Sequence, residues 1–212
     1  MERRLAAILL TDMVNYSRLI GLDEEGTIAR QRVHREEIID LKIFEHGGRI
    51  VKTTGDGLLV EFPSVVDAVK CAVEVQTELA DRDAEVPEDQ RIQYRIGINL
   101  GDVVVDGDDI LGDGVNVAAR LEGLAKPGRI CISGSVYDQL AGKLDAVFEN
   151  GGEQTIKNVQ RPVQVWHWES GQVSRNLGDT GHQQPPLPDL SLIHISEPTR
   201  LLVQSRLPAE AG

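Results

Sequence analysis

Two aspartates in this sequence have side chains that could carry out chemistry. Each stands at the end of an apolar, strand-like segment. Asp12 closes the run Leu5–Thr11, and Asp56 lies between glycines in the turn Gly55–Gly57. Such a turn lets the backbone bend tightly and approach a ligand closely. Two carboxylates brought together from two strands make a site of hard oxygen ligands for Mg²⁺ or Mn²⁺. Pairs of such ions commonly catalyse displacement reactions at phosphorus. On these residues alone, an ordinary hairpin turn and an unrelated acid are the favoured interpretation, because turn aspartates are common.

A third segment, from about Gly112 to Leu124, has helical periodicity. Asn116 and Arg120 are four residues apart, so they project from the same face of this helix. Asparagine is a poor residue for a helix interior, because its amide competes for backbone hydrogen bonds. The pair therefore suggests polar groups aimed at a ligand, although a surface pair facing solvent is the simpler alternative for this segment alone. The buried stripe is expected to comprise Val115, Ala118, Ala119 and Leu121–Leu124.

Together and in this order, the three segments resemble the catalytic domain of the class III nucleotide cyclases, the adenylate and guanylate cyclase family. The resemblance covers about residues 4 to 169. It implies that Asp12 and Asp56 bind two Mg²⁺ or Mn²⁺ ions, as the matching aspartates of the family do. In that family a lysine four residues before the second aspartate and an aspartate seven residues before the helix asparagine read adenine. The resemblance therefore gives this role to Lys52 and Asp109.

The resemblance also assigns roles to the helix pair and to two more cations. It implies that Asn116 orients the ribose and that Arg120 stabilises the transition state. In the family, an arginine of the fourth strand and a lysine near the end of the domain bind the substrate phosphates. The resemblance gives these roles to Arg95 and, as a weaker match, Lys157. Six positions have the family's spacing and order, and no single one of them would be as specific: Asp12, Lys52, Asp56, Asp109, Asn116 and Arg120.

Because all six roles are filled, the resemblance implies an active adenylate cyclase that converts ATP to 3′,5′-cyclic AMP and pyrophosphate. It also implies a head-to-tail homodimer with two sites at the interface. Asp12 and Asp56 of one copy would face the base-reading, ribose and transition-state residues of the other copy. A symmetric pair would then build two complete sites from one kind of chain.

Three alternatives remain open at the level of the sequence. Lys52 and Asp109 argue against a guanylate cyclase, since guanine recognition in the family uses a glutamate and a smaller polar residue there. The intact set of metal and transition-state residues argues against a catalytically silent nucleotide-sensing domain. A diguanylate cyclase shares the general architecture, but the segment Gly55–Gly57 lacks the second acidic residue of that family's signature.

Composition is consistent with this assignment. The 212 residues suffice for one domain with a substantial core, and a net charge of −12 disfavours a nucleic acid as partner. Cys71 and Cys131 lie in apolar segments without metal-ligand spacing, as expected of small buried side chains in the reducing cytoplasm. The apolar run Leu5–Leu10 is too short to span a bilayer, so no membrane insertion is expected.

The order of strands and helices predicts an α+β fold, with a ferredoxin-like core in which helices cover a central, mostly antiparallel sheet. Helices are expected at 16–45 with a break near 21–25, at 64–79, at 112–124 and at 134–140. Strands are expected at 4–12, on both sides of the turn at 55–57, and at 92–100, 103–105, 129–133, 146–149, 153–156 and 163–169.

The domain is expected to be residues 1–169, with a change of composition after Glu169. Residues 170–190 are expected to be a disordered linker and residues 191–212 a disordered tail. Ser191–Arg200 resembles a translated sequencing adapter, which would mean that the natural frame ended near Asp189 and that C-terminal domains were lost. An ordinary disordered tail is the alternative.

Overall fold

The structure, a computed structural model, describes residues 2–156, 159 and 162–169. Lys157, the linker at 170–190 and the tail at 191–212 lie outside these residues. Its helices are α1 (Tyr16–Leu22), α2 (Glu24–His34), the π-helical turn η1 (Arg35–Ile39), α3 (Asp40–Glu45), α4 (Val65–Arg82), the 3₁₀ turn η2 (Glu88–Gln90), α5 (Asp113–Leu124) and α6 (Gly134–Leu140). Its strands are β1 (Glu2–Met13), β2 (Arg49–Thr54), β3 (Gly57–Phe62), β4 (Tyr94–Asp106), β5 (Asp109–Leu111), β6 (Ile130–Ser133), β7 (Glu149–Gln154) and β8 (Val163–Trp168).

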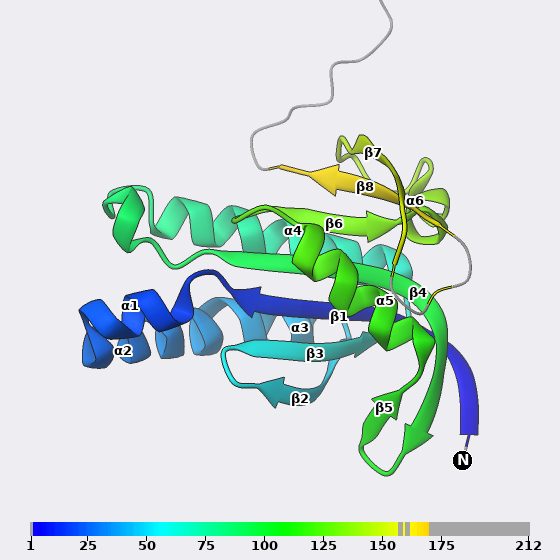
Figure 1. The fold of residues 1–212 in the computed structure, drawn as a ribbon, viewed down its shortest axis with the longest axis horizontal. Helices are drawn as coiled ribbons and strands as arrows, with labels where there is room; N and C mark the ends of the chain where they lie inside the picture. Colours follow the sequence, from blue (N-terminus) through cyan, green and yellow to red (C-terminus); the bar gives the residue numbers. More distant parts are fainter. Residues whose placement is uncertain (1, 157–158, 160–161, 170–212) are drawn as a thin grey trace, which may run out of the picture. The chain divides into compact units, whose positions relative to one another are not determined.

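The described strands form one sheet in the order β2-β3-β1-β4-β6-β8-β7, and β5 pairs with the far end of β4. All neighbouring strands run antiparallel except β4 and β6, which are parallel. The predicted α+β fold with a mostly antiparallel sheet is therefore confirmed. Figure 1 shows α5 crossing in front of β1 and β4, while α3 and α4 lie behind the sheet.

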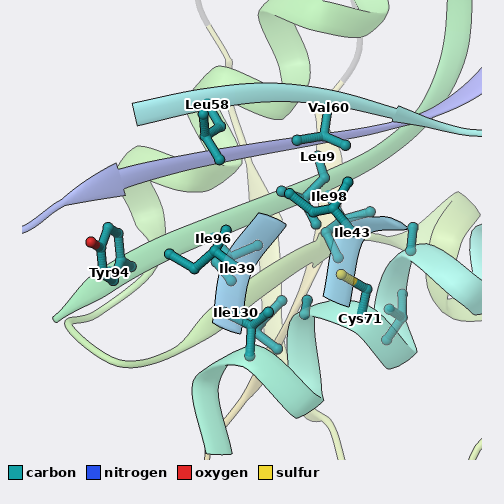
Figure 2. Packing of buried hydrophobic residues seen from close by; sticks show 14 of the residues in the cluster. Leu9, Ile39, Ile43, Leu58, Val60, Cys71, Tyr94, Ile96, Ile98 and Ile130 are labelled. Atoms are coloured by element: carbon teal, nitrogen blue, oxygen red, sulfur yellow. The ribbon is translucent and has the colours of Figure 1, made fainter. Parts of the chain in front are cut away.

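The main hydrophobic core lies between the sheet and the helices behind it. Ile96 and Ile98 of β4 meet Ile39, Ile43 and Cys71 from the helices (Figure 2). In β1 the side chains alternate between the two faces, as expected for a strand covered on both sides. Ala7 and Leu9 belong to the main core, whereas Ala6 and Ile8 pack in a second cluster with Ala118 of α5.

Both cysteines are buried and free, as the sequence predicted. Burial raises the pKa of the Cys71 thiol and of the Cys131 thiol to about 12, so both remain protonated near neutral pH. The described residues contain no helix that is long and apolar enough to cross a membrane.

Three expected elements differ from the structure. The two strands expected at 92–100 and 103–105 are one strand, β4, because β1 pairs with it from Glu2↔Val105 to Met13↔Tyr94 and carries it through Gly101. The two strands expected at 146–149 and 153–156 are also one, β7, which pairs with β8. The buried residues of α5 are Gly114, Val117, Ala118 and Leu121. Ala118 and Leu121 of the expected stripe are thus confirmed, whereas Val115 and Ala119 are half-buried and Leu124 is exposed.

Candidate functional site

The two aspartates lie next to one another at the end of β1 and in the β2–β3 turn. The turn fits against β1 because of Gly57, where a Cβ atom would stand 2.3 Å from the backbone carbonyl oxygen of Thr11. Gly55 has φ +68, the left-handed conformation that glycine adopts without strain. Burial raises the pKa of the Asp56 carboxyl above its ordinary value, and the negative charge of Asp12 raises it further. Two adjacent carboxylates that repel each other attract a positively charged group.

Arg95 neutralises part of this charge. It stands opposite Asp12 in the β1–β4 pairing, and its Nη2 donates to Asp12 Oδ2 at 2.6 Å. Arg95 Nε also lies 3.0 Å from Oε1 of Glu122 in α5, an ion pair in which neither buried atom makes a hydrogen bond. Burial raises the pKa of Glu122, whereas the nearby charge of Arg95 lowers it. We call Asp12, Asp56, Arg95 and Glu122 the carboxylate cluster.

Sequence analysis did not identify Glu122. The signal that could have found it is Gly97, two residues after Arg95 and therefore on the same face of β4. A Cβ atom at Gly97 would stand 2.2 Å from the backbone nitrogen of Glu122 and 2.4 Å from the carbonyl oxygen of Ala118. The missing side chain lets α5 lie directly on β4, which brings Glu122 to Arg95.

The two residues assigned to adenine also lie together. Lys52 Nζ stands 2.7 Å from Asp109 Oδ2, across the gap between β2 and β5. The β2–β3 pairing shifts register between Ile50 and Lys52, a bulge in β2. Asp109 Oδ1 accepts a hydrogen bond from the backbone nitrogen of Ile110 at 2.8 Å. The hydrogen bond from Lys52 lowers the pKa of Asp109. The pair is solvent-accessible, with 42% of the Lys52 side chain and 37% of the Asp109 side chain exposed.

Asn116 and Arg120 are exposed on one face of α5, as predicted. Their side chains make no hydrogen bond or ion pair with any residue that the structure describes. Arg120 lines a cavity of about 270 Å³ together with Leu124 and residues 154–156. We call Lys52, Asp109, Asn116 and Arg120 the exposed polar group. Lys157, the second predicted phosphate ligand, cannot be placed because it lies outside the described residues.

The donor chemistry of the carboxylate cluster fits a magnesium or manganese ion. The described residues contain no group of three or more His, Cys, Asp or Glu side chains that could hold a metal ion. Asp12 and Asp56 alone would therefore not enclose an ion. Mg²⁺, however, usually takes one or two carboxylates and completes its shell with water and substrate phosphates. Two carboxylates at an accessible strand end match that mode of binding.

Comparison with known proteins finds a matching family and related chains. The family model described as the adenylate and guanylate cyclase catalytic domain matches residues 4–169. A Rhizobium meliloti protein named "Putative adenylate cyclase 3" is 43% identical over 185 residues, which cover 87% of this chain and 32% of that protein. The chain thus spans about a third of the length of this relative.

Solved structures show the same fold. An adenylate/guanylate cyclase/hydrolase from Silicibacter pomeroyi is 48% identical with a TM-score of 0.76, covering 79% of this chain and 98% of that one. The guanylyl cyclase Cya2 is 27% identical with a TM-score of 0.67, covering 84% of this chain and 96% of that one. Similar structures therefore carry names of both nucleotide specificities.

Proposed function

Because the chain belongs to the adenylate and guanylate cyclase catalytic-domain family, we propose that it is an adenylate cyclase that works as a homodimer with shared sites. The observation that carries the adenylate assignment is the ion pair between Lys52 and Asp109. The proposed reaction converts ATP to 3′,5′-cyclic AMP and pyrophosphate. The ribose 3′-oxygen forms a bond to the α-phosphorus, the bond from that phosphorus to the bridging oxygen of the β-phosphate breaks, and the 3′-hydroxyl proton is released.

Asp12 and Asp56 would hold the metal ions of this reaction. Two Mg²⁺ or Mn²⁺ ions bound there would supply positive charge to the phosphates and lower the pKa of the 3′-hydroxyl. Arg95, which neutralises Asp12 in the structure, would turn its guanidinium to the terminal phosphates while Glu122 stays beside its Nε. Lys157 would be a second cation for the phosphates.

Asn116 and Arg120 would act on the reacting centre. Asn116 would hold the ribose so that the 3′-oxygen points at phosphorus, which contributes through orientation. Arg120 would face the charge that develops on the α-phosphate, where fixed guanidinium donors are most effective. Both side chains have unused hydrogen-bonding capacity among the described residues, so no protein contact has to break before they bind substrate.

Lys52 and Asp109 would select adenine. The Lys52 ammonium can donate to adenine N1, and the Asp109 carboxylate can accept from the exocyclic amine. Guanine presents a donor at N1 and an acceptor at O6, the opposite pattern. A mismatched buried polar group costs about 1–3 kcal/mol, so ATP should be clearly preferred over GTP.

A shared site explains why the two groups differ in their pairing. The carboxylate cluster contains its own counter-ion, Arg95, whereas Asn116 and Arg120 find no partner in the described part of their own chain. The tip of the β2–β3 hairpin carries Asp56, while Lys52 lies farther along β2, opposite Leu59 and beside β5. In a head-to-tail dimer these two parts of the hairpin would serve different sites, each completed by the second copy.

The buried free thiols suit the reducing conditions of the cytoplasm, which is where we place the reaction. The relative from Rhizobium meliloti is about three times as long as the matched segment. By analogy with this relative, we propose that further domains regulate the cyclase in the natural protein.

The test is a direct assay of the purified chain. ATP or GTP would be supplied with Mg²⁺ or Mn²⁺, and the cyclic nucleotide measured by chromatography. The proposal predicts cyclic AMP with either metal and clearly lower turnover of GTP. Equal use of both nucleotides would contradict the adenylate assignment, and a preference for GTP would favour a guanylate cyclase. No cyclic product under any condition would favour a silent nucleotide-sensing domain.

A further inference from the structure

A buried carboxylate on β3 lies between two arginines, away from the carboxylate cluster. Only 5% of the Glu61 side chain is exposed. Its Oε2 accepts hydrogen bonds from Nη2 of Arg4 and Nη2 of Arg49, each at 2.9 Å. Its Oε1 lies against Nη1 of Arg4 in an ion pair without hydrogen-bond geometry. A buried charge needs such partners, because an unpaired carboxylate in a protein interior is strongly destabilising.

Arg49 makes one more contact, which Arg4 does not. Its Nη1 donates to the backbone carbonyl oxygen of Asp108 at 2.9 Å. Asp108 lies in the turn between β4 and β5, immediately before Asp109 of the base-reading pair. The guanidinium of Arg49 therefore joins the buried carboxylate of β3 to the turn that carries Asp109.

Side-chain contacts hold the β4–β5 hairpin against its neighbours, and they include Ile110 of β5, which is buried in a cluster with Leu59 and Ala118. Strand β5 pairs with β4 through its backbone and with no other described strand. Toward β2, the hydrogen bonds that the structure shows from the described residues are Arg49 to Asp108 and Lys52 to Asp109. When Lys52 and Asp109 turn to a purine, as the proposed function requires, their own ion pair weakens. The Arg49 contact then remains as the polar link between the hairpin and β2.

We propose that Arg49, fixed by the buried Glu61, is a positioning residue for nucleotide specificity. It holds the β4–β5 hairpin against β2 so that the Lys52 ammonium and the Asp109 carboxylate keep the spacing of the two adenine edge groups. This inference rests on the proposed adenylate cyclase function. Discrimination between purines requires polar groups held in place by their supporting contacts, since a loosened donor or acceptor can adapt to the wrong base.

The chain offers a matched control for this role. Arg4→Ala removes one arginine from Glu61 but leaves the contact between Arg49 and Asp108. Arg49→Ala removes both the second arginine and the hairpin contact. Arg49→Lys keeps a positive charge near Glu61, but a compact ammonium lacks the planar fork that reaches the carboxylate and the carbonyl together.

The experiment measures kcat and KM for ATP and for GTP with the full chain and its three variants. Arg49→Ala should lower kcat/KM for ATP by about tenfold, the effect of losing one charge-assisted hydrogen bond. The loss should appear mainly in KM, and kcat/KM for GTP should change little, so the ATP/GTP ratio falls. Arg4→Ala should keep the wild-type ratio, and Arg49→Lys should give an intermediate ratio.

An unchanged ratio in Arg49→Ala would overturn the positioning role while leaving the proposed function intact. An equal fall of the ratio in Arg4→Ala would also overturn it, because the effect would then come from Glu61 and β3 rather than from the hairpin contact. Circular dichroism would verify the fold of each variant. Should Arg49→Ala not fold, a wild-type ratio in Arg49→Lys would overturn the inference and an intermediate ratio would support it. A wild-type chain without preference for ATP would instead overturn the proposed function.

Discussion

The carboxylate cluster and the exposed polar group are built in opposite ways. In the cluster, Asp12 is paired with Arg95, and Arg95 with Glu122, so the cation that offsets part of the negative charge lies in the same chain. In the exposed polar group, Lys52 and Asp109 form an ion pair at the surface. The side chains of Asn116 and Arg120 make no hydrogen bond or ion pair with a described residue. The contrast indicates that the carboxylate cluster is assembled within one chain. In the proposed function, the exposed polar group instead binds nucleotide and faces the carboxylate cluster of a second copy.

The largest effect should follow from removing a metal ligand. Asp12→Ala or Asp56→Ala should lower cyclic AMP formation by about a thousandfold or more, since loss of a metal site removes several kcal/mol of transition-state stabilisation. The measurement is kcat with Mn²⁺ at saturating ATP, with circular dichroism as the control for folding. Near-normal turnover in either variant would show that the metal assignment is wrong.

Removal of the transition-state arginine should have the next largest effect. Arg120→Ala should lower kcat by about 10²–10³-fold with little change in KM, because the contact is made chiefly as charge develops on the α-phosphate. Arg120→Lys should restore only part of this loss, since an ammonium lacks the bidentate geometry. A rise in KM at unchanged kcat would instead give Arg120 a role in ground-state binding.

A smaller effect is expected at Glu122, the member of the carboxylate cluster that does not bind metal in this account. In Glu122→Gln, Arg95 would keep Asp12 as its sole charged partner and would compete more strongly with the metal ion. The apparent Mn²⁺ affinity, from titration of activity and from binding followed by electron paramagnetic resonance, should fall by about threefold, as for a partly exposed ion pair. Tighter Mn²⁺ binding in this variant would contradict the competition.

The smallest effect should be on stability, and it should be a gain, whereas the changes above all cause a loss. Asp56→Asn removes a carboxylate whose pKa is raised by burial and by Asp12, so the metal-free variant should unfold about 2 °C higher than wild type near pH 7. The folded state binds the Asp56 proton more tightly than the unfolded state does. Wild type therefore gains stability as the pH falls through this raised pKa, and the difference should shrink. Thermal unfolding at several pH values with a chelator checks this, and a less stable variant at neutral pH would contradict it.

The sequence predicted the parts of the fold that depend on local patterns. The strand that ends at Asp12, the Gly55–Gly57 turn and the helix that carries Asn116 and Arg120 all lie where periodicity and turn chemistry indicated. The family resemblance gave Lys52 and Asp109 a shared role at the base. The structure places these two side chains 2.7 Å apart.

Features that depend on contacts between distant segments were missed. Gly101 resembles a turn residue, yet it continues β4 because β1 pairs with it and α5 lies close above it. A Cβ atom at Gly101 would stand 2.9 Å from Cα of Gly114. In the sequence, Glu122 resembles a charged residue on the exposed surface of a helix. In the structure it faces Arg95, because Gly97 allows α5 to lie directly on β4. The contact of Arg49 with both Glu61 and Asp108 joins three segments that no short pattern connects.

The central claim is that each site combines the carboxylate cluster of one copy with the exposed polar group of another. Inactive Asp12→Ala chains would be mixed with inactive Arg120→Ala chains, and heterodimer formation would be verified by mass spectrometry. One site of each heterodimer would carry both changes and the other site neither, so the shared-site account predicts that cyclic AMP formation partly returns. Verified heterodimers that stay inactive would contradict the account and favour a site contained within one chain.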